Sequence, residues 1–178
     1  FDDLQGLIEY SKSNNGALVA FDAKPQELLM KYVDGETEAG FKLVSTKSSA
    51  EAIQNLLGDH VVASFAAGAH IPYIESGDLK MIASANASRH GYAPDTQTVV
   101  EQGYEIYVDP YFFIAAPAGL PADTKAALAE ALHNAINSEA ARKAIVNALK
   151  TDPSDLGPDG TQNMLVEGVG NVKKLFGK

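Results

Sequence analysis

The segment 47–51, of sequence KSSAE, carries the side chains best suited to binding chemistry. It follows an apolar run that predicts a strand, and Ser48 and Glu51 have the S-x-x-E spacing of a capping box at a helix start. The free N–H groups and the positive dipole end of such a helix attract a carboxylate. The segment therefore indicates either an anion site formed by Lys47, Ser48 and Ser49, or a helix that Ser48 only caps.

A second polar turn, Asp22 to Lys24, follows the apolar run 17–21, which also predicts a strand. In a sheet of parallel strands both turns lie at the carboxyl edge, where ligands bind in α/β folds. Asp22 and Lys24 are therefore further candidates, with Lys24 as the cation for an anionic ligand. The alternative is that Lys24 is a solvated lysine of a loop.

A group of aromatic side chains lies where the regular alternation of elements ends. Its members are Tyr104, Tyr107, Tyr111, Phe112 and Phe113. Aromatic rings at this place predict a wall on which a ligand stacks, or the core packing of a last strand. Core packing explains at least Phe113 equally well.

The composition narrows the classes of function. The chain has 14 basic and 23 acidic residues and a formal net charge of -9, which disfavours binding to the phosphates of nucleic acid. It has no cysteine, so disulfides, thiolate catalysis and zinc–thiolate sites are excluded. The sequence contains no dinucleotide loop, phosphate loop or nucleophile elbow, and its four histidines lack metal-ligand spacing. We therefore expect no enzyme, no cofactor and no metal site.

The elements that must position these residues alternate between strands and helices. Strands are predicted over 17–21, 41–45, 60–65, 79–83 and 111–116, and helices over 2–14, 25–33, 48–57, 68–76 and 96–102. Turns are predicted at 34–35 and 157–160, and three further helices over 122–137, 138–149 and 161–175. This alternation is typical of an α/β fold with a mostly parallel sheet and helices on both faces. The alternation of strands and helices ends near residue 108 and a mainly helical part follows, so we expect the chain to divide into 1–108 and 109–178.

Four segments, in this order along the chain, match a known pattern. They cover 44–61, 71–80, 94–103 and 114–121; the third reads PDTQTVVEQG and the fourth IAAPAGLP. The third corresponds to P-D-x-x-T-V-x-E-x-G and the fourth to F-A-P-A-G-x-P. In these segments the chain resembles the tripartite tricarboxylate transporter substrate-binding proteins, the Bug-type periplasmic receptors.

The resemblance implies a periplasmic binding protein type II-like fold, in which two α/β lobes joined by crossing strands close on a ligand. Residues 1–108 then correspond to the second lobe. Residues 109–178 correspond to the return crossing strand and the C-terminal helices of a truncated first lobe. A hinge is expected near residues 107–111.

The resemblance further implies a periplasmic receptor that captures a small organic acid and delivers it to membrane transporter subunits. The family's ligand loop, rich in glycine and hydroxyl groups, is replaced here by residues 22–24, and its frequent Ser-Trp pair by Asp109-Pro110. The expected ligand-binding residues belong to the two turns and to the crossing: Lys47, Ser48, Ser49, Asp22, Lys24, Asp109 and Tyr111.

Two expectations concern what lies outside the chain. A ligand-sensing domain of a regulator has the same two-lobed architecture, and a DNA-binding helix-turn-helix before residue 1 would favour it, whereas a signal peptide would favour the receptor. A missing part of the first lobe would expose apolar surface, so that a homodimer of the truncated chain is also expected.

Overall fold

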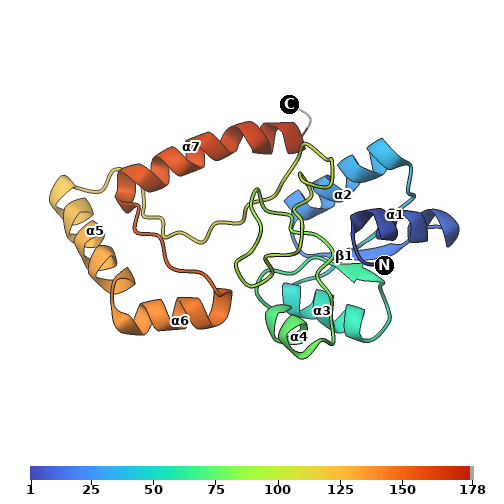
Figure 1. Cartoon of the computed structure of the whole chain (residues 1–178). Coiled ribbons are helices and arrows are strands. Elements are labelled where there is room, and N and C mark those ends of the chain that lie inside the picture. Colours follow the sequence, from blue (N-terminus) through green and yellow to red (C-terminus); the bar gives the residue numbers. More distant parts are fainter. Residues whose placement is uncertain (177–178) are drawn as a thin grey trace. The chain divides into compact units, whose positions relative to one another are not determined.

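The computed structural model describes residues 1–176, without the side chains of residues 171, 172 and 174 (Figure 1). The chain forms two compact units: Phe1–Asp109 together with 171–178, and Pro110–Gly170. The first unit holds the sheet and the predicted ligand-binding turns. The second holds three helical segments.

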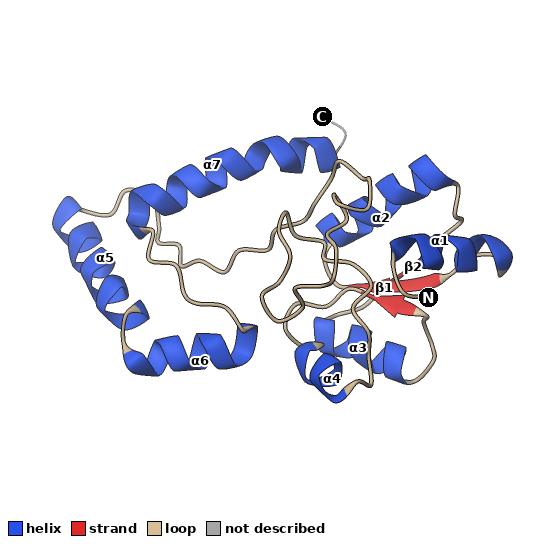
Figure 2. Ribbon diagram, viewed as in Figure 1, coloured by secondary structure: helices blue, strands red, loops and turns tan. Residues whose placement is uncertain are grey.

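A parallel sheet of three strands organises the first unit. Its strands are β1 (Leu18–Phe21), β2 (Lys42–Ser45) and β3 (Ala63–Ser64), in the order β2-β1-β3. Two crossover helices connect them, α2 (Lys24–Thr37) and α3 (Ser49–Leu57), and α4 (Ile71–Ser76) follows β3. Figure 2 shows α2 and α3 on opposite sides of the strands. These features confirm the α/β fold with a parallel sheet and helices on both faces.

The central strand β1 contributes side chains to two separate cores. Val19 is 2% exposed and packs with the larger apolar cluster, whereas Ala20 is fully buried in a smaller cluster with Ala52 and Val61. Successive side chains of a strand point to opposite faces of the sheet, so this division follows from the strand geometry. A sheet covered on both faces needs such a two-sided apolar strand.

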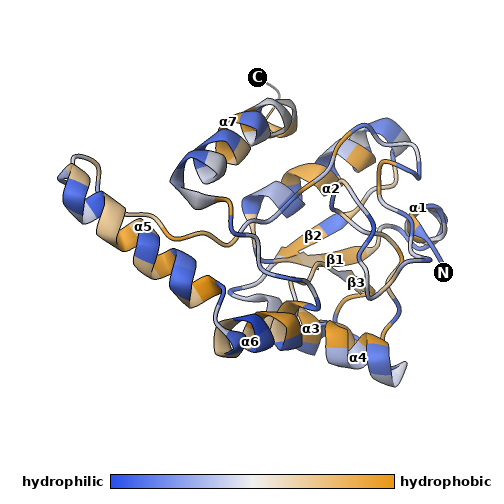
Figure 3. Cartoon of the chain, turned by 60° about the vertical axis from the view of Figure 1, so that its left-hand side comes forward, coloured by the Kyte–Doolittle hydropathy of each residue, from blue (hydrophilic) through white to orange (hydrophobic). Residues whose placement is uncertain are grey.

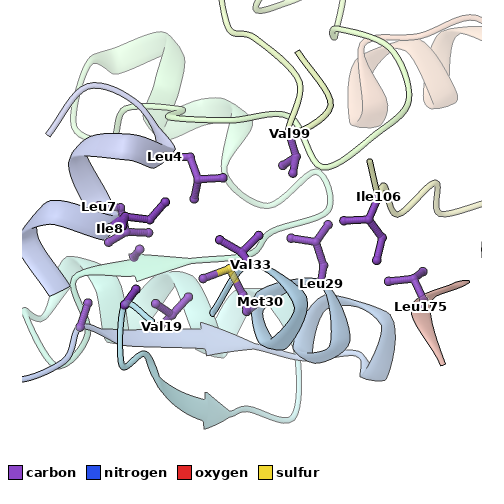
Figure 4. Close-up of a cluster of buried hydrophobic side chains, with 13 residues drawn as sticks. Leu4, Leu7, Ile8, Val19, Leu29, Met30, Val33, Val99, Ile106 and Leu175 are labelled. Atoms are coloured by element: carbon purple, nitrogen blue, oxygen red, sulfur yellow. The ribbon is translucent and has the colours of Figure 1, made fainter. Parts of the chain in front are cut away.

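The larger cluster joins α1 (Leu4–Ser13), β1 and α2 with residues from the end of the unit. Figure 4 shows ten of its members: Leu4, Leu7, Ile8, Val19, Leu29, Met30, Val33, Val99, Ile106 and Leu175. Asp3 caps the start of helix α1, and its carboxylate accepts a hydrogen bond from Gly6 N at 2.8 Å. The buried hydroxyl of Ser11 donates to Ala39 O and accepts from Ala17 N, both at 2.8 Å, and so fixes the entry into β1.

Helix α2 is longer than predicted, because the expected turn at residues 34–35 lies inside it. The helix continues to Thr37 and ends at Glu38, which has a left-handed φ of 53°. The Asp34 carboxylate accepts from Gly40 N at 2.7 Å and from Phe41 N at 3.0 Å. Asp34 therefore stabilises the turn before β2 instead of ending α2.

Three expected elements are absent from the described residues: the strands 79–83 and 111–116 and the helix 96–102. Strand β3 covers only two residues of the predicted strand 60–65. Residues 79–83 form no strand, and the only ladder contact nearby is an isolated parallel bridge between Ser84 and Thr98. Residues 96–102 form turns, in which Thr98 N donates to the Glu101 carboxylate at 2.8 Å. A strand exists only where a neighbouring strand pairs with it, and apolar composition alone does not supply that partner.

The predicted strand 111–116 is also wrong. Residues 111–116 have no strand assignment, and Phe112 and Ile114 are 76% and 72% exposed. Phe113 is 51% exposed, which contradicts its assignment to a core.

The second unit consists of α5 (Ala122–Ile136), α6 (Glu139–Leu149) and most of α7 (Gly157–Leu175). Neither α5 nor α6 has a buried residue, and Figure 3 shows hydrophobic residues interspersed with hydrophilic ones along α5. Helix α7 begins at Gly157, so the turn expected at 157–160 is its first turn, where Thr161 Oγ1 donates to Gly157 O at 2.7 Å. None of the helices in residues 1–176 is both long and apolar enough to cross a membrane.

Candidate functional site

The carboxyl ends of the three strands meet at one edge of the sheet, and Thr46 ties two of the following turns together. Thr46 N donates to Phe21 O at 2.8 Å, and its hydroxyl lies 3.0 Å from Phe21 O and 3.2 Å from Ser48 O. The Thr46 side chain is nearly buried. The turns after β1 and β2 therefore lie side by side, as the predicted site requires. No sequence pattern indicates a role for Thr46, since a single threonine after an apolar run forms no recognisable motif.

Replacing Thr46 by valine is expected to lower the free energy of unfolding by about 0.5–1.5 kcal/mol, because the isosteric side chain leaves two carbonyls without the hydroxyl donor. Urea unfolding would measure the loss. Thr37→Val is the matched control: its hydroxyl also donates to a carbonyl, Val33 O, but at the end of a helix that water reaches. Equal losses in the two variants would contradict the structural role of Thr46.

Ser48 and Glu51 form a shifted version of the predicted capping box. Ser48 Oγ accepts from Glu51 N at 3.2 Å, while the Glu51 carboxylate accepts from Lys47 N at 2.9 Å, one residue before the cap. Ser48 thus caps α3. Because its oxygen acts as the acceptor, the hydroxyl proton is a further donor.

Ser49 links the turn after β2 to the segment after β3. Its hydroxyl oxygen accepts from Ala67 N at 3.0 Å. Phe65 N in turn donates to Ala20 O at 2.9 Å. Hydrogen bonds therefore join the segments after β2 and β3 to each other and to β1 at this edge of the sheet, which we call the carboxyl edge.

Lys24 lies at the carboxyl edge but already has an anionic partner. Its Nζ is 2.7 Å from the Glu27 carboxylate, which also pairs with Lys31. The hydrogen bonds from Lys24 and then from Lys31 lower the pKa of Glu27. The side chains of both lysines are more than half exposed, and such ion pairs contribute little to stability, so another carboxylate can compete for Lys24.

The backbone of the same turn is organised by Gln26. Its side-chain oxygen accepts from Asp22 N at 2.9 Å and from Ala23 N at 3.2 Å. These bonds hold the turn between β1 and α2 in place.

The two remaining candidates belong to different compact units. Asp109 is the last residue of the first unit's main segment, and its carboxylate accepts from Ala87 N at 2.9 Å. Tyr111 belongs to the second unit and is 48% exposed. The hydrogen bonds of Thr46 place the end of β1, before Asp22 and Lys24, beside the start of the turn with residues 47–49, and the Asp109 carboxylate holds the loop at residue 87.

A hollow of about 350 Å³ lies between α2 and β2 of the first unit. Its lining residues are Phe21, Glu27, Met30, Lys31, Asp34, Phe41 and Leu43. The Glu27 and Lys31 side chains pair with each other, and Asp34 accepts two backbone hydrogen bonds. The polar groups of the hollow thus have partners within the first unit.

Three rings form a cluster, which we call the ring cluster: His70, His90 and Tyr92. His70 Nε2 and the Tyr92 hydroxyl are hydrogen-bonded at 2.9 Å, and the rings of His90 and Tyr92 stack with centroids 4.8 Å apart. His70 stands at the start of α4. Twenty residues separate the two histidines, so no local spacing could reveal the cluster.

Burial sets the proton affinities in the ring cluster. It lowers the pKa of His70, with a further lowering from His90, and it raises the pKa of Tyr92. Burial also lowers the pKa of His90, while the Asp109 carboxylate acts in the opposite direction. Desolvation disfavours the charged form of a histidine, so burial favours the neutral form of both imidazoles.

Comparison with known proteins gives a consistent result. The model of a family described as tripartite tricarboxylate transporter family receptor (TctC) matches residues 1–173. Protein BugT of Bordetella pertussis is 29% identical over 175 residues, which are 93% of this chain and 52% of BugT. A Cupriavidus necator protein, described as "UPF0065 protein in gbd 5'region", is 28% identical over 135 residues, which are 74% of this chain and 40% of that protein. The chain thus spans about half the length of these relatives.

Two solved structures share the fold. R. palustris Rpa4515 with adipate has a TM-score of 0.75 at 18% identity, covering 98% of this chain and 58% of that protein. A TctC solute-binding protein from Polaromonas, without ligand, has a TM-score of 0.72 at 18% identity, covering 99% and 62%. These likenesses confirm the predicted fold of a solute-binding protein.

Proposed function

The chain belongs to the tripartite tricarboxylate transporter receptor family, and from this premise we propose that it is part of a periplasmic receptor that captures a small organic acid for a membrane transporter. The observation that carries the proposal is the family match over residues 1–173. On this proposal the chain binds its ligand without chemical conversion. No observation favours the alternative of a sensing domain in a regulator.

The ligand carboxylate is proposed to bind at the carboxyl edge, at the start of α3. The net charge of -9 repels anions in general, so an anionic ligand needs local donors. Ser48 and Ser49 each accept one hydrogen bond there and can donate their hydroxyl protons. The positive end of the α3 dipole and Lys47 add attraction for a negative charge.

A second carboxylate of a dicarboxylic ligand is proposed to contact Lys24 in the neighbouring turn. Thr46 holds the two turns side by side, and Glu27 is an exchangeable partner of Lys24. Adipate, named with the R. palustris protein, is such a dicarboxylate. Asp22, in the same turn, disfavours any ligand whose negative charge approaches it closely.

Closure around the ligand is proposed to involve the segment near residues 107–111. The division between the compact units falls at Asp109 and Pro110, which supports a change of lobe at this place. On this proposal residues 1–108 are the second lobe, and 109–178 are the return crossing and helices of the first. Asp109 and Tyr111, one on each side of this division, are proposed as further ligand contacts.

Thermal melting of the whole receptor, with both lobes, against a panel of mono-, di- and tricarboxylates tests the proposal. An acid at 100 times its dissociation constant should stabilise the protein by ~2.7 kcal/mol, which corresponds to a midpoint shift of several degrees. The uncharged amide of each active acid is the matched control and should give no shift. If no acid in the panel shifts the midpoint, the proposed function is wrong.

A further inference from the structure

The ring cluster contains a polar atom that its surroundings do not satisfy. His70 Nδ1 is buried and has no hydrogen-bond partner among the described residues, whereas Nε2 bonds to the Tyr92 hydroxyl. If Nε2 accepts from the hydroxyl, Nδ1 carries the proton and lacks an acceptor. If Nε2 donates, Nδ1 is an acceptor without a donor. Either tautomer therefore leaves one buried polar group without a partner, which is unfavourable.

A solute is not the partner of this nitrogen in the described state. The atom is closed off from solvent, so a ligand reaches it only after the cluster has opened. The unpaired nitrogen is therefore important for the protonation of His70, because a proton added to this ring must find an acceptor inside the cluster.

Protonation of His70 conflicts with the packed arrangement. An imidazolium donates from both nitrogens, and the Tyr92 oxygen can accept from only one of them. The second N–H would stay buried without an acceptor, next to His90, whose positive charge lowers the pKa of His70 further. The packed ring cluster is thus compatible only with a neutral His70.

The charges around the cluster offer little compensation. The titratable groups that act on His70 are His90 and Tyr92, and the carboxylate that acts on His90 is Asp109. That carboxylate already accepts a hydrogen bond from Ala87 N. The neighbouring cation Arg89 is engaged with Glu101 and with Pro94 O.

The ring cluster connects two segments that are far apart along the chain. His70 stands at the start of α4, and His90 and Tyr92 belong to the loop 86–94. We propose that the ring cluster is an acid-sensitive clasp, which fixes the loop 86–94 to the start of α4 while both imidazoles are neutral and releases the loop when they are protonated. This inference stands on the geometry of the cluster and does not depend on the identity of the solute.

Hydrogen–deuterium exchange of the loop 86–94 in the full chain tests the clasp. Protection, corrected for intrinsic exchange at each pH, should fall about five-fold between about pH 7.5 and about pH 5.5, equivalent to ~1 kcal/mol of opening free energy. His70→Gln removes one of the two imidazoles, so its loop protection should fall less than that of the wild type, and the double variant H70Q/H90Q should show no fall. His60→Gln, which removes an exposed histidine outside the cluster, should keep the fall of the wild type.

A wild-type loop whose protection does not change with pH would overturn the proposal. A fall of wild-type size in His70→Gln would overturn it as well. If His70→Gln does not fold, the wild type decides: the NMR titration of the His70 ring and the loss of loop protection should share one midpoint. Two separate midpoints would show that the clasp does not respond to His70.

Discussion

Replacing Leu29 by alanine is expected to lower the free energy of unfolding by about 2–5 kcal/mol, the largest loss among the variants considered. Leu29 is 1% exposed and lies on α2, where it packs in the cluster shared with α1 and the end of the first unit (Figure 4). Truncation removes buried methyl groups and leaves a cavity that close-packed neighbours cannot fill. Urea denaturation would measure the loss.

Leu57→Ala is the matched control for this prediction. Leu57 is the same residue type, on helix α3, but is 39% exposed. Its truncation removes less buried area and leaves no enclosed cavity, so the loss should be no more than about 1 kcal/mol. Similar losses in the free energy of unfolding for both variants would mean that Leu29 of α2 does not pack in the core of the first unit.

The elements that the sequence predicted well are those whose signals are local. Helix α3 was expected over 48–57 and spans Ser49–Leu57, because Ser48 and Gly58 are the residue types that begin and end helices. Helix α1 was expected over 2–14 and spans Leu4–Ser13 for the same reason, with Asp3 as its cap. In both helices the capping side chain lies within three residues of the N–H that it satisfies.

The failures arise where a structure depends on residues far along the chain. The run 79–83 has the composition of a strand, but the only bridge nearby, at Ser84, pairs with Thr98 in a bend of the chain. The run 111–116 is apolar, yet its backbone pairs with no strand in the described residues. Composition reports the tendency of a segment to be buried, and pairing requires a partner that composition does not identify.

In the candidate site, too, the local features were predicted and the contacts between distant residues were not. The two turns were predicted to meet because parallel strands place their carboxyl ends at one edge, and Thr46 does join them. The contact of Ser49 with Ala67 and the contact of His70 with Tyr92 span 18 and 22 residues. Neither pair shares a periodicity or a motif, so only the folded chain reveals them.

The double variant S48L/S49L is expected to weaken binding of the acid found in the melting panel at least about tenfold, or ~1.4 kcal/mol. It removes both hydroxyl donors and places bulky side chains at the start of α3, where the carboxylate is proposed to lie. Titration calorimetry would measure the dissociation constant.

Loss of the helix cap is a separate effect, and the chain provides a control for it. Ser138 caps α6 by accepting from Ala141 N at 3.2 Å, the same bond that Ser48 makes with Glu51 N, but it belongs to the second unit. Ser138→Leu should destabilise its helix by about 0.5–2 kcal/mol without changing the dissociation constant. If S48L/S49L folds and binds the acid as tightly as the wild type, the carboxylate does not bind at the start of α3. If both variants lose affinity equally, the loss reflects weakened helices, and the hydroxyls of Ser48 and Ser49 have no specific role in binding.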